Sequence, residues 1–145
     1  MATQQKRIAD IMSKDVEFVR CGTSLADAAK KMQELDCGFL PISDTQGNKL
    51  LGVVTDRDIV LRGVALGKDP QNTTVDDVCG NQVLYCFATD LVERAASSMQ
   101  EQQIYRLVVL DHPDTKKLCG VISLNDIVRH DERMLAMAAV QGIAA

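Results

Sequence analysis

The chain has 145 residues, 46% of them hydrophobic, with a formal net charge of −4 and a sequence pI of about 5.1. An acidic chain with 3% aromatic residues and no run of Lys and Arg is not expected to bind nucleic acid. No apolar stretch approaches the roughly 20 residues that span a bilayer, and the N-terminus lacks the apolar core of a signal peptide. We therefore expect a cytoplasmic protein with no membrane partner.

The first elements along the chain are a short helix in residues 7–12 and an extended segment in residues 16–20. An amphipathic helix is predicted next, because apolar residues recur at the i, i+3, i+4 and i+7 spacing of one helix face. These residues are Leu25, Ala28, Ala29 and Met32. Thr23 or Ser24 is expected to cap the N-terminus of this helix.

Residues 39–43 predict a strand, which a polar turn in residues 44–49 connects to a second strand in residues 49–55. A further helix is expected to begin at Asp56. A polar linker then covers residues 63–74, in which Gly67 is typical of a helix C-terminus and Pro70 prevents continuation.

The second half of the chain repeats the first, with an offset of 67 residues that becomes 68 after the hairpin turn. The repeated elements are residues 74–79, residues 83–87, a helix with Val92, Ala95, Ala96 and Met99, residues 106–110, 111–117 and 117–123, and a helix from Leu124. Asp90 and Glu93 predict the start of the second long helix, because D-x-x-E resembles a capping box.

Each repeat reads β-α-β-β-α, which predicts a mixed α/β (α+β) fold of two units that share a core. We expect the first domain in residues 7–66 and the second in residues 74–130. Residues 131–145 predict a C-terminal helical tail that either caps one lobe or joins a dimer contact. Its apolar side is formed by Met134, Leu135, Met137 and Ala138.

The cysteines and histidines give no sign of metal binding or catalysis. Five cysteines form no CxxC pair, so we expect buried free thiols; a bridge between Cys21 and Cys37, or redox sensing by either, is the alternative. His112 and His130 lie in polar segments and are expected to face solvent. Without a nucleophile elbow or a P-loop, the chain is not expected to be an enzyme.

The end of each repeat pairs a hydroxyl with a carboxylate three residues later: Thr55 with Asp58, and Ser123 with Asp126. One interpretation is a capping box at a helix start. The other is a nucleotide site, in which the carboxylate binds ribose, donors bind phosphate and an apolar slot takes the base. The candidate slot residues are Phe39, Leu40, Pro41, Leu107 and Val108, and the candidate phosphate ligands are Thr55, Ser123, Arg57 and Arg106.

The endings Gly52-Val53-Val54-Thr55-Asp56-Arg57-Asp58-Ile59 and Gly120-Val121-Ile122-Ser123-Leu124-Asn125-Asp126-Ile127 resemble those of CBS domains. From residue 7 to residue 129 the chain resembles a tandem CBS pair, or Bateman module, of the stand-alone bacterial hypoxic-response type. The resemblance implies two pseudo-twofold-related units packed sheet to sheet, with clefts between them that bind AMP, ADP or ATP. It also makes NAD or S-adenosylmethionine possible ligands, and implies a homodimer.

The resemblance assigns Thr55 and Asp58 to one ligand, and Ser123 and Asp126 to the other. Backbone near Val16, Phe39 and Leu40 would flank the first base, and Val83, Arg106 and Leu107 the second. The second repeat has Leu124 and Asn125 where the first has Asp56 and Arg57, so the two sites are not expected to bind alike. No cofactor is required for this function, a regulatory module that signals to an effector protein or through its dimer state. The alternative is a structural dimerisation scaffold with empty clefts.

Overall fold

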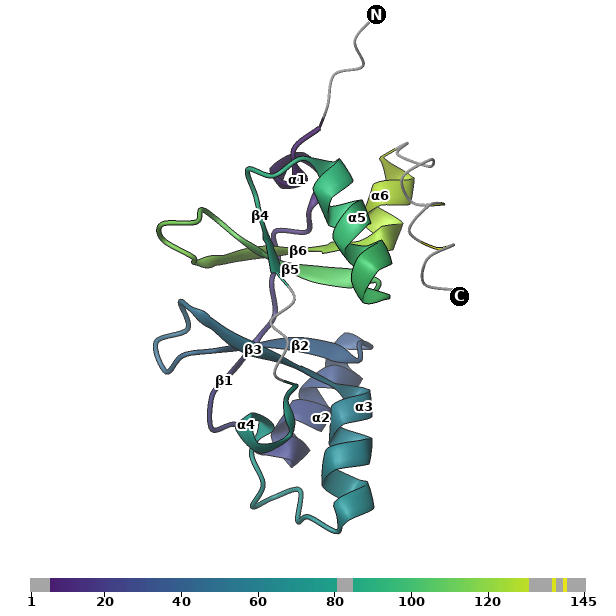
Figure 1. Cartoon of the computed structure of the whole chain (residues 1–145). Helices are drawn as coiled ribbons and strands as arrows, with labels where there is room; N and C mark the ends of the chain where they lie inside the picture. The colour runs from purple at the N-terminus through teal and green to yellow at the C-terminus, as the bar shows by residue number, and fades with distance from the viewer. Residues whose placement is uncertain (1–5, 81–84, 131–136, 138–139, 141–145) are drawn as a thin grey trace, which may run out of the picture. The chain divides into compact units, whose positions relative to one another are not determined.

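The computed structural model describes residues 6–80, 85–130, 137 and 140 and divides the chain into two compact units (Figure 1). We call Glu17–Leu84 the Thr55 unit, and Met1–Val16 together with Tyr85–Ala145 the Ser123 unit. Each unit contains a three-stranded sheet, which confirms the predicted mixed α/β fold. The predicted tail in residues 131–145, with Met134, Leu135 and Ala138, lies outside the described residues except for the exposed Met137 and Val140.

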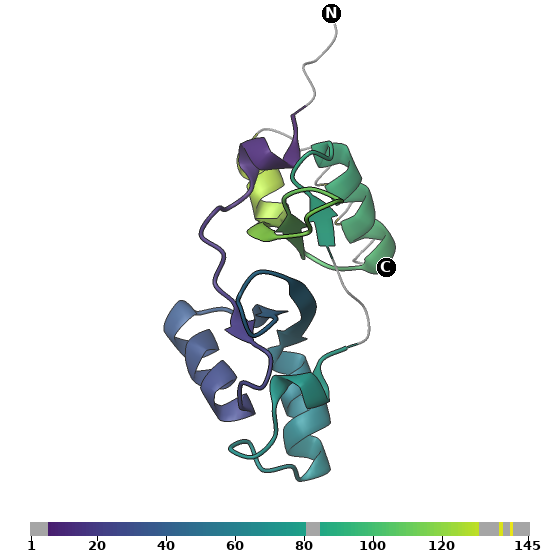
Figure 2. The ribbon, with the colours of Figure 1, turned by 90° about the vertical axis from the view of Figure 1, so that its left-hand side faces the viewer.

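The Thr55 unit contains strands β1 (Val19–Arg20), β2 (Phe39–Ser43) and β3 (Leu50–Thr55). β1 is parallel to β2, with helix α2 (Leu25–Leu35) as the crossover, and β2 is antiparallel to β3. α2 and the helix that begins at α3 (Asp56–Asp58) lie on one side of this sheet (Figures 1 and 2). The core between them consists of Val19, Leu25, Ala28, Met32, Leu40, Ile42, Val54, Val75 and Val78.

The Ser123 unit repeats this arrangement with β4 (Tyr85–Phe87), β5 (Arg106–Leu110) and β6 (Leu118–Ser123). β4 is parallel to β5 and β5 is antiparallel to β6. Helices α5 (Val92–Gln102) and α6 (Leu124–Arg129) contact each other and the sheet. The predicted strands of both repeats and the helix starts at Asp56 and Leu124 are therefore confirmed. The first extended segment is a strand only over Val19–Arg20, and its counterpart is a strand over Tyr85–Phe87.

The short helix that opens each sequence repeat packs in the compact unit that contains the sheet and long helix of the other repeat. α1 (Ile8–Ile11) donates from the Ile8 amide to the Asp90 carbonyl at 2.8 Å. Its counterpart α4 (Val75–Val78) donates from the Val75 amide to the Thr23 carbonyl, also at 2.8 Å. A compact unit is thus not a repeat of the sequence, because the repeats exchange their opening helices.

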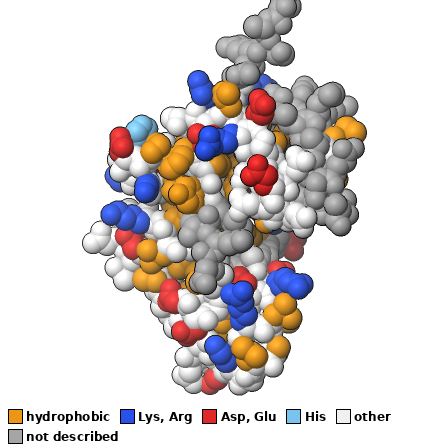
Figure 3. All heavy atoms as spheres, in the orientation of Figure 1, with side chains coloured by type: hydrophobic (Ala, Val, Ile, Leu, Met, Phe, Trp, Pro, Cys, Tyr) orange, Lys and Arg blue, Asp and Glu red, His pale blue; other side chains and the backbone are white. Residues whose placement is uncertain are grey.

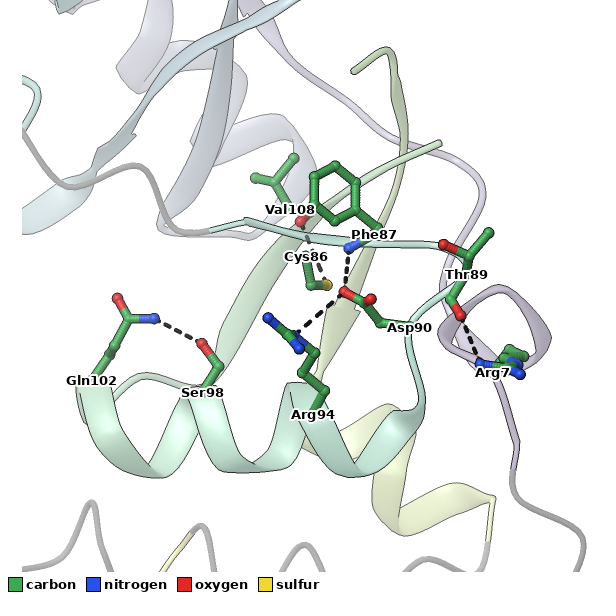
Figure 4. A network of polar contacts seen from close by, with 9 residues as sticks. All are labelled: Arg7, Cys86, Phe87, Thr89, Asp90, Arg94, Ser98, Gln102 and Val108. Carbon is green, nitrogen blue, oxygen red and sulfur yellow. Dashed lines mark hydrogen bonds and ion pairs between the residues drawn. The ribbon is translucent and has the colours of Figure 1, made fainter. Parts of the chain in front are cut away.

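The two long helices start differently. Ser24 caps α2 by accepting a hydrogen bond from the Asp27 amide at 3.1 Å, so of the two predicted caps it is Ser24 that acts. The prediction that Asp90 and Glu93 form a capping box on α5 is wrong, because the N-cap residue is Leu91 and its side chain makes no cap. Asp90 instead accepts from the Phe87 amide at 3.0 Å and lies 3.9 Å from Arg94 (Figure 4).

The apolar faces of the long helices also differ. In α5 all four predicted residues are buried: Val92, Ala95, Ala96 and Met99. In α2 only Leu25, Ala28 and Met32 are buried, whereas Ala29 is exposed, contrary to the prediction. The buried stripe of α2 is therefore narrower than that of α5.

The last helix of the Thr55 unit runs into the predicted linker of residues 63–74 and ends at Gly67, the residue predicted as a helix C-terminus. After α3 it continues as a π-helical turn over Ile59–Gly63 and a 3-10 turn over Val64–Leu66. It ends at Gly67, whose φ of 72° is the left-handed conformation expected of a helix C-terminus. The exposed apolar side chains on this helix are Val60, Leu61, Val64 and Leu66. Apolar side chains are visible over this helix in Figure 3.

The five cysteines are free thiols. Cys21 and Cys37 pack against the core of the Thr55 unit and are not bridged, but they are only partly buried, so the expectation of buried thiols holds for Cys86 alone. Cys86 is buried in its sheet, and this burial raises the pKa of its thiol to about 12. Such a thiol is protonated at neutral pH and is a poor nucleophile.

Candidate functional site

The first candidate site is the junction between β3 and α3, where an apolar strand ends in a polar helix start. The Thr55 amide donates to the Asp58 Oδ2 at 3.0 Å, and the Asp58 amide donates to the Thr55 Oγ1 at 3.1 Å. This reciprocal pair is a capping box, which supplies two free amides of the helix start with acceptors. The box fixes the hydroxyl and the carboxylate side by side at the end of the sheet.

The second candidate site is the junction between β6 and α6, and it has the same geometry. The Ser123 amide donates to the Asp126 Oδ2 at 2.8 Å, and the Asp126 amide donates to the Ser123 Oγ at 3.1 Å. Asp126 is buried, whereas Asp58 is half-buried. The capping interpretation of both motifs is therefore correct, but it does not decide whether the same atoms also bind a ligand.

The strand register sorts the candidate slot residues of the Thr55 unit onto two faces of the sheet. Phe39 pairs with Thr55, and Pro41 pairs with Val53, so these four lie on one face. Leu40 lies on the opposite face and belongs to the core that α2 covers. Because its side chain is a core residue, Leu40 is available to a ligand only through its backbone.

The register of the Ser123 unit is equivalent. Arg106 pairs with Ser123, so its exposed guanidinium lies on the same face as the hydroxyl. Leu107 pairs with Ile122 on the other face, and both are fully buried. Val108 lies on the face of Arg106 but is also fully buried. Of the residues predicted here, Arg106 has the most accessible side chain.

The residue after the hydroxyl differs between the sites. The Asp56 amide donates to the Gly38 carbonyl at 2.9 Å, and its carboxylate lies over Gly38, where an added Cβ would be 2.5 Å from Asp56 Oδ2. In the Ser123 unit the Leu124 amide donates to the Tyr105 carbonyl at 2.8 Å, and Leu124 is buried. The first site therefore has an exposed acid beside Arg57 where the second has an apolar contact next to Asn125.

Arg129 was not predicted as part of either site. Its guanidinium Nη2 contacts the Asp126 Oδ1 as an ion pair with i, i+3 spacing on α6. The i, i+3 spacing of Asp126 and Arg129 was visible in the sequence, but the burial of the Asp126 carboxylate, which makes this ion pair different from an ordinary surface pair, was not. The corresponding position in the Thr55 unit is Leu61, which has no polar group.

Two predicted residues cannot be assigned to the sites. Val83 lies outside the described residues. Val16 belongs to the Ser123 unit and not to the Thr55 unit, to which the first site belongs. Among the described residues, no group of three or more His, Cys, Asp or Glu side chains could hold a metal ion, and no helix is long and apolar enough to cross a membrane.

Known proteins match this chain along most of its length. The CBS domain family matches residues 8–64 and 75–133. Hypoxic response protein 1 of Mycobacterium tuberculosis is 35% identical over 121 residues, which cover 83% of this chain and 82% of that protein. A crystal structure of Hypoxic Response Protein I with two coordinated zinc ions is 34% identical, with a TM-score of 0.77 over 86% of this chain and 98% of that chain.

Two similar structures contain adenosyl ligands. The CBS domain pair of protein MJ0100, in complex with 5′-methylthioadenosine and S-adenosyl-L-methionine, is 26% identical with a TM-score of 0.75, covering 90% of this chain and 98% of that chain. CBSX2 in complex with AMP is 25% identical with a TM-score of 0.71, covering 88% and 97%. CBS pairs are regulatory modules. The chain belongs to the CBS domain family and carries two CBS domains in tandem.

Proposed function

We propose that this protein is a regulatory module that binds an adenosyl ligand of the AMP, ADP or ATP class at its Thr55 and Ser123 motifs. The main observation behind this proposal is that a hydroxyl and a carboxylate lie side by side at the strand–helix junction of both units, Thr55 with Asp58 in the Thr55 motif and Ser123 with Asp126 in the Ser123 motif. Relatives with the same fold bind AMP, 5′-methylthioadenosine and S-adenosylmethionine, which supports this ligand class.

At the Thr55 motif the proposed roles follow from the chemistry of each side chain. Asp58 accepts hydrogen bonds from the ribose hydroxyls, as an acidic residue does in dinucleotide-binding folds. The hydroxyl of Thr55 and the exposed Arg57 contact phosphate, although Asp56 offsets part of the positive charge. Phe39, which is half-buried, lies on the same sheet face as Thr55 and contacts the base, whereas Pro41 on that face is buried.

At the Ser123 motif Asp126 would take the ribose, while Ser123 and Arg106 contact phosphate. Asn125 occupies the position of Arg57 and contributes a neutral donor. Because Leu124 replaces Asp56, this motif has no second acid to oppose a phosphate. NAD and S-adenosylmethionine remain within the proposed ligand class, since both carry the adenosyl group that the motif would bind.

The alternative function is a structural dimerisation scaffold in which the motifs only cap helices. The observation that favours it is that the capping boxes already use one oxygen of each carboxylate. A cap that is lost costs about 1 kcal/mol. The scaffold therefore predicts that Asp58→Asn lowers stability and has no effect on any ligand.

The two functions are separated by a thermal-shift screen against AMP, ADP, ATP, NAD and S-adenosylmethionine. A ligand that binds only the native state raises the melting midpoint by mass action. At a free ligand concentration of 100 times Kd, the free energy of unfolding rises by about 2.7 kcal/mol. We expect a shift that the double variant Asp58→Asn with Asp126→Asn abolishes. Asp10→Asn is the control, because Asp10 accepts from the Arg7 amide at another helix start. Unchanged midpoints with every ligand at millimolar concentration favour the scaffold.

The proposed assembly is a cytoplasmic homodimer that signals to an effector protein. Val60, Leu61, Val64 and Leu66 form the exposed apolar surface best suited to burial between two copies. Light scattering is expected to give a dimer that Val64→Glu converts to a monomer. Leu51→Glu is the control, because Leu51 is also an exposed apolar residue but lies on β3. A wild-type protein that is monomeric contradicts the homodimer.

A further inference from the structure

We propose that the Ser123 motif binds the ribose of an adenosyl ligand more weakly than the Thr55 motif does, because Arg129 competes with the ribose for Asp126. Arg129 acts through Asp126 and is a positioning residue. This inference rests on the proposed function, because it takes the ribose of an adenosyl ligand as the group that each carboxylate binds.

Both oxygens of Asp126 are engaged in the structure. Oδ2 accepts from the Ser123 amide at 2.8 Å, and Oδ1 contacts the Arg129 guanidinium. The Asp126 side chain is 7% exposed, while that of Arg129 is 64% exposed. The carboxylate is therefore withdrawn from solvent, and the guanidinium contacts the oxygen that the capping box leaves available.

Asp58 presents a different arrangement. Its Oδ2 accepts from the Thr55 amide at 3.0 Å, while its Oδ1 has no hydrogen-bond or ion-pair partner within the described parts of the chain. The two carboxylates are 68 residues apart, and at that offset the counterpart of Arg129 is Leu61. A leucine side chain has no donor, so it does not compete for the free oxygen.

The consequence for binding follows from what a ribose diol needs. Each of the two ribose hydroxyls donates one hydrogen bond, and at the Thr55 motif Asp58 Oδ1 is ready to accept one of them. At the Ser123 motif the ribose must displace the guanidinium or share the oxygen with it. The loss of one partly exposed, charge-assisted contact weakens binding by about three- to tenfold. The Thr55 motif is therefore filled first as ligand concentration rises.

The test measures each motif alone, with adenosine as the probe because it has ribose but no phosphate for Arg129 to attract. Isothermal titration calorimetry in the Asp58→Asn background reports the Ser123 motif, and in the Asp126→Asn background it reports the Thr55 motif. We expect the Thr55 motif to bind adenosine about three- to tenfold more tightly. Adding Arg129→Leu to the first background should restore most of this factor, and Arg129→Lys, which keeps a charged donor, should not.

The reciprocal change is the matched second variant. Leu61→Arg places a guanidinium three residues after Asp58. Because Leu61 is exposed and belongs to the proposed dimer surface, Leu61→Ala is the control, and light scattering verifies that both variants have the same oligomeric state. In the Asp126→Asn background Leu61→Arg should weaken adenosine binding by a similar factor. Circular dichroism melts of all variants verify that each is folded before titration.

The outcomes separate this inference from the proposed function. Equal adenosine affinities at the two motifs, or affinities that neither Arg129→Leu nor Leu61→Arg changes, overturn the role of Arg129 and leave adenosyl binding intact. Absence of binding to the wild-type protein by adenosine and by all five adenosyl ligands of the thermal-shift screen overturns the proposed function, and the role of Arg129 with it.

Discussion

The Thr55 and Ser123 units have the same backbone plan but differ in how tightly the segment beside the last strand is packed. In the Ser123 unit, Ser13 pairs with Val121, the residue after Gly120, through two hydrogen bonds of 2.9 and 3.0 Å. In the Thr55 unit, among the described residues, a Cβ added at the corresponding Gly52 would meet only the Cys79 sulfur within 4 Å. Both units thus keep the same strand order and register, while the space beside the equivalent glycines differs.

The largest expected difference between the units lies in the long helices. Ala96 of α5 is 4% exposed, whereas its counterpart Ala29 of α2 is exposed. Ala96→Glu buries a carboxylate without a partner and should lower the free energy of unfolding by roughly 3–5 kcal/mol. Ala29→Glu should change it by no more than about 0.5 kcal/mol.

Urea denaturation of the two variants measures this difference directly. Similar losses in both would mean that the apolar faces of α2 and α5 are equally buried, as the sequence periodicity predicted. That result would remove the largest of the differences on which the comparison of the units rests.

The second difference concerns the glycines that begin the two motifs. A Cβ at Gly120 would lie 2.6 Å from the Ser13 carbonyl oxygen and 2.8 Å from the Met12 sulfur, so the Ser13 backbone must move. We expect Gly120→Ala to cost about 1–3 kcal/mol, the usual penalty of overpacking. A Cβ at Gly52 would lie 3.7 Å from the Cys79 Sγ, an ordinary contact, so Gly52→Ala should have little effect.

Chemical denaturation gives the free energies, and amide exchange at Val121 reports whether the pairing with Ser13 is lost. If Gly52→Ala is as harmful as Gly120→Ala, the motif requires glycine for a reason common to both units. The close approach of the Ser13 backbone to Gly120 would then not explain the loss of stability.

The sequence predicted the element order, because apolar residues recur with helical and strand periods in both halves and the turns lie between them. It did not reveal the exchange of opening helices, since the hydrogen bonds from Ile8 to Asp90 and from Val75 to Thr23 join backbone atoms. Backbone atoms carry no residue-specific signal. The capping boxes of both motifs were predicted correctly, because their spacing is local. The contact of Arg129 with Asp126 was missed, because burial of the carboxylate depends on packing that spacing does not record.

A third, smaller difference is the start of the long helices. Ser24→Ala removes the acceptor of the Asp27 amide and should destabilise the protein by about 1 kcal/mol. Hydrogen exchange should accelerate at the Asp27 amide.

Asp90→Ala should accelerate exchange at the Phe87 amide, because Asp90 accepts a hydrogen bond from it. Exchange at the Arg94 amide should not change, because that amide donates to the Leu91 carbonyl. Faster exchange at Arg94 in that variant would show that Asp90 does support the start of α5.

The smallest expected effect compares the acids that organise the two hairpin turns. The Asn48 amide, followed by other turn amides, lowers the pKa of Asp44, and the Thr115 hydroxyl, followed by the Lys117 amide, lowers the pKa of Asp111. Since both pKa values lie below the ordinary 3.8, each carboxylate contributes stability above that pH and loses it as the pH falls through the folded-state pKa.

Thr115→Ala distinguishes the two turns, because only Asp111 accepts a bond from a side-chain hydroxyl, at 2.8 Å. Carboxyl-carbon NMR titration should show the pKa of Asp111 rising toward 3.8 while that of Asp44 stays where it is in the wild type. The stability lost on acidification below pH 3.8 should shrink accordingly, since the pKa of Asp111 in the folded chain then lies closer to that in the unfolded chain. An Asp111 titration that the substitution leaves unchanged would assign its low pKa to the backbone amides alone, and the two turns would then work in the same way.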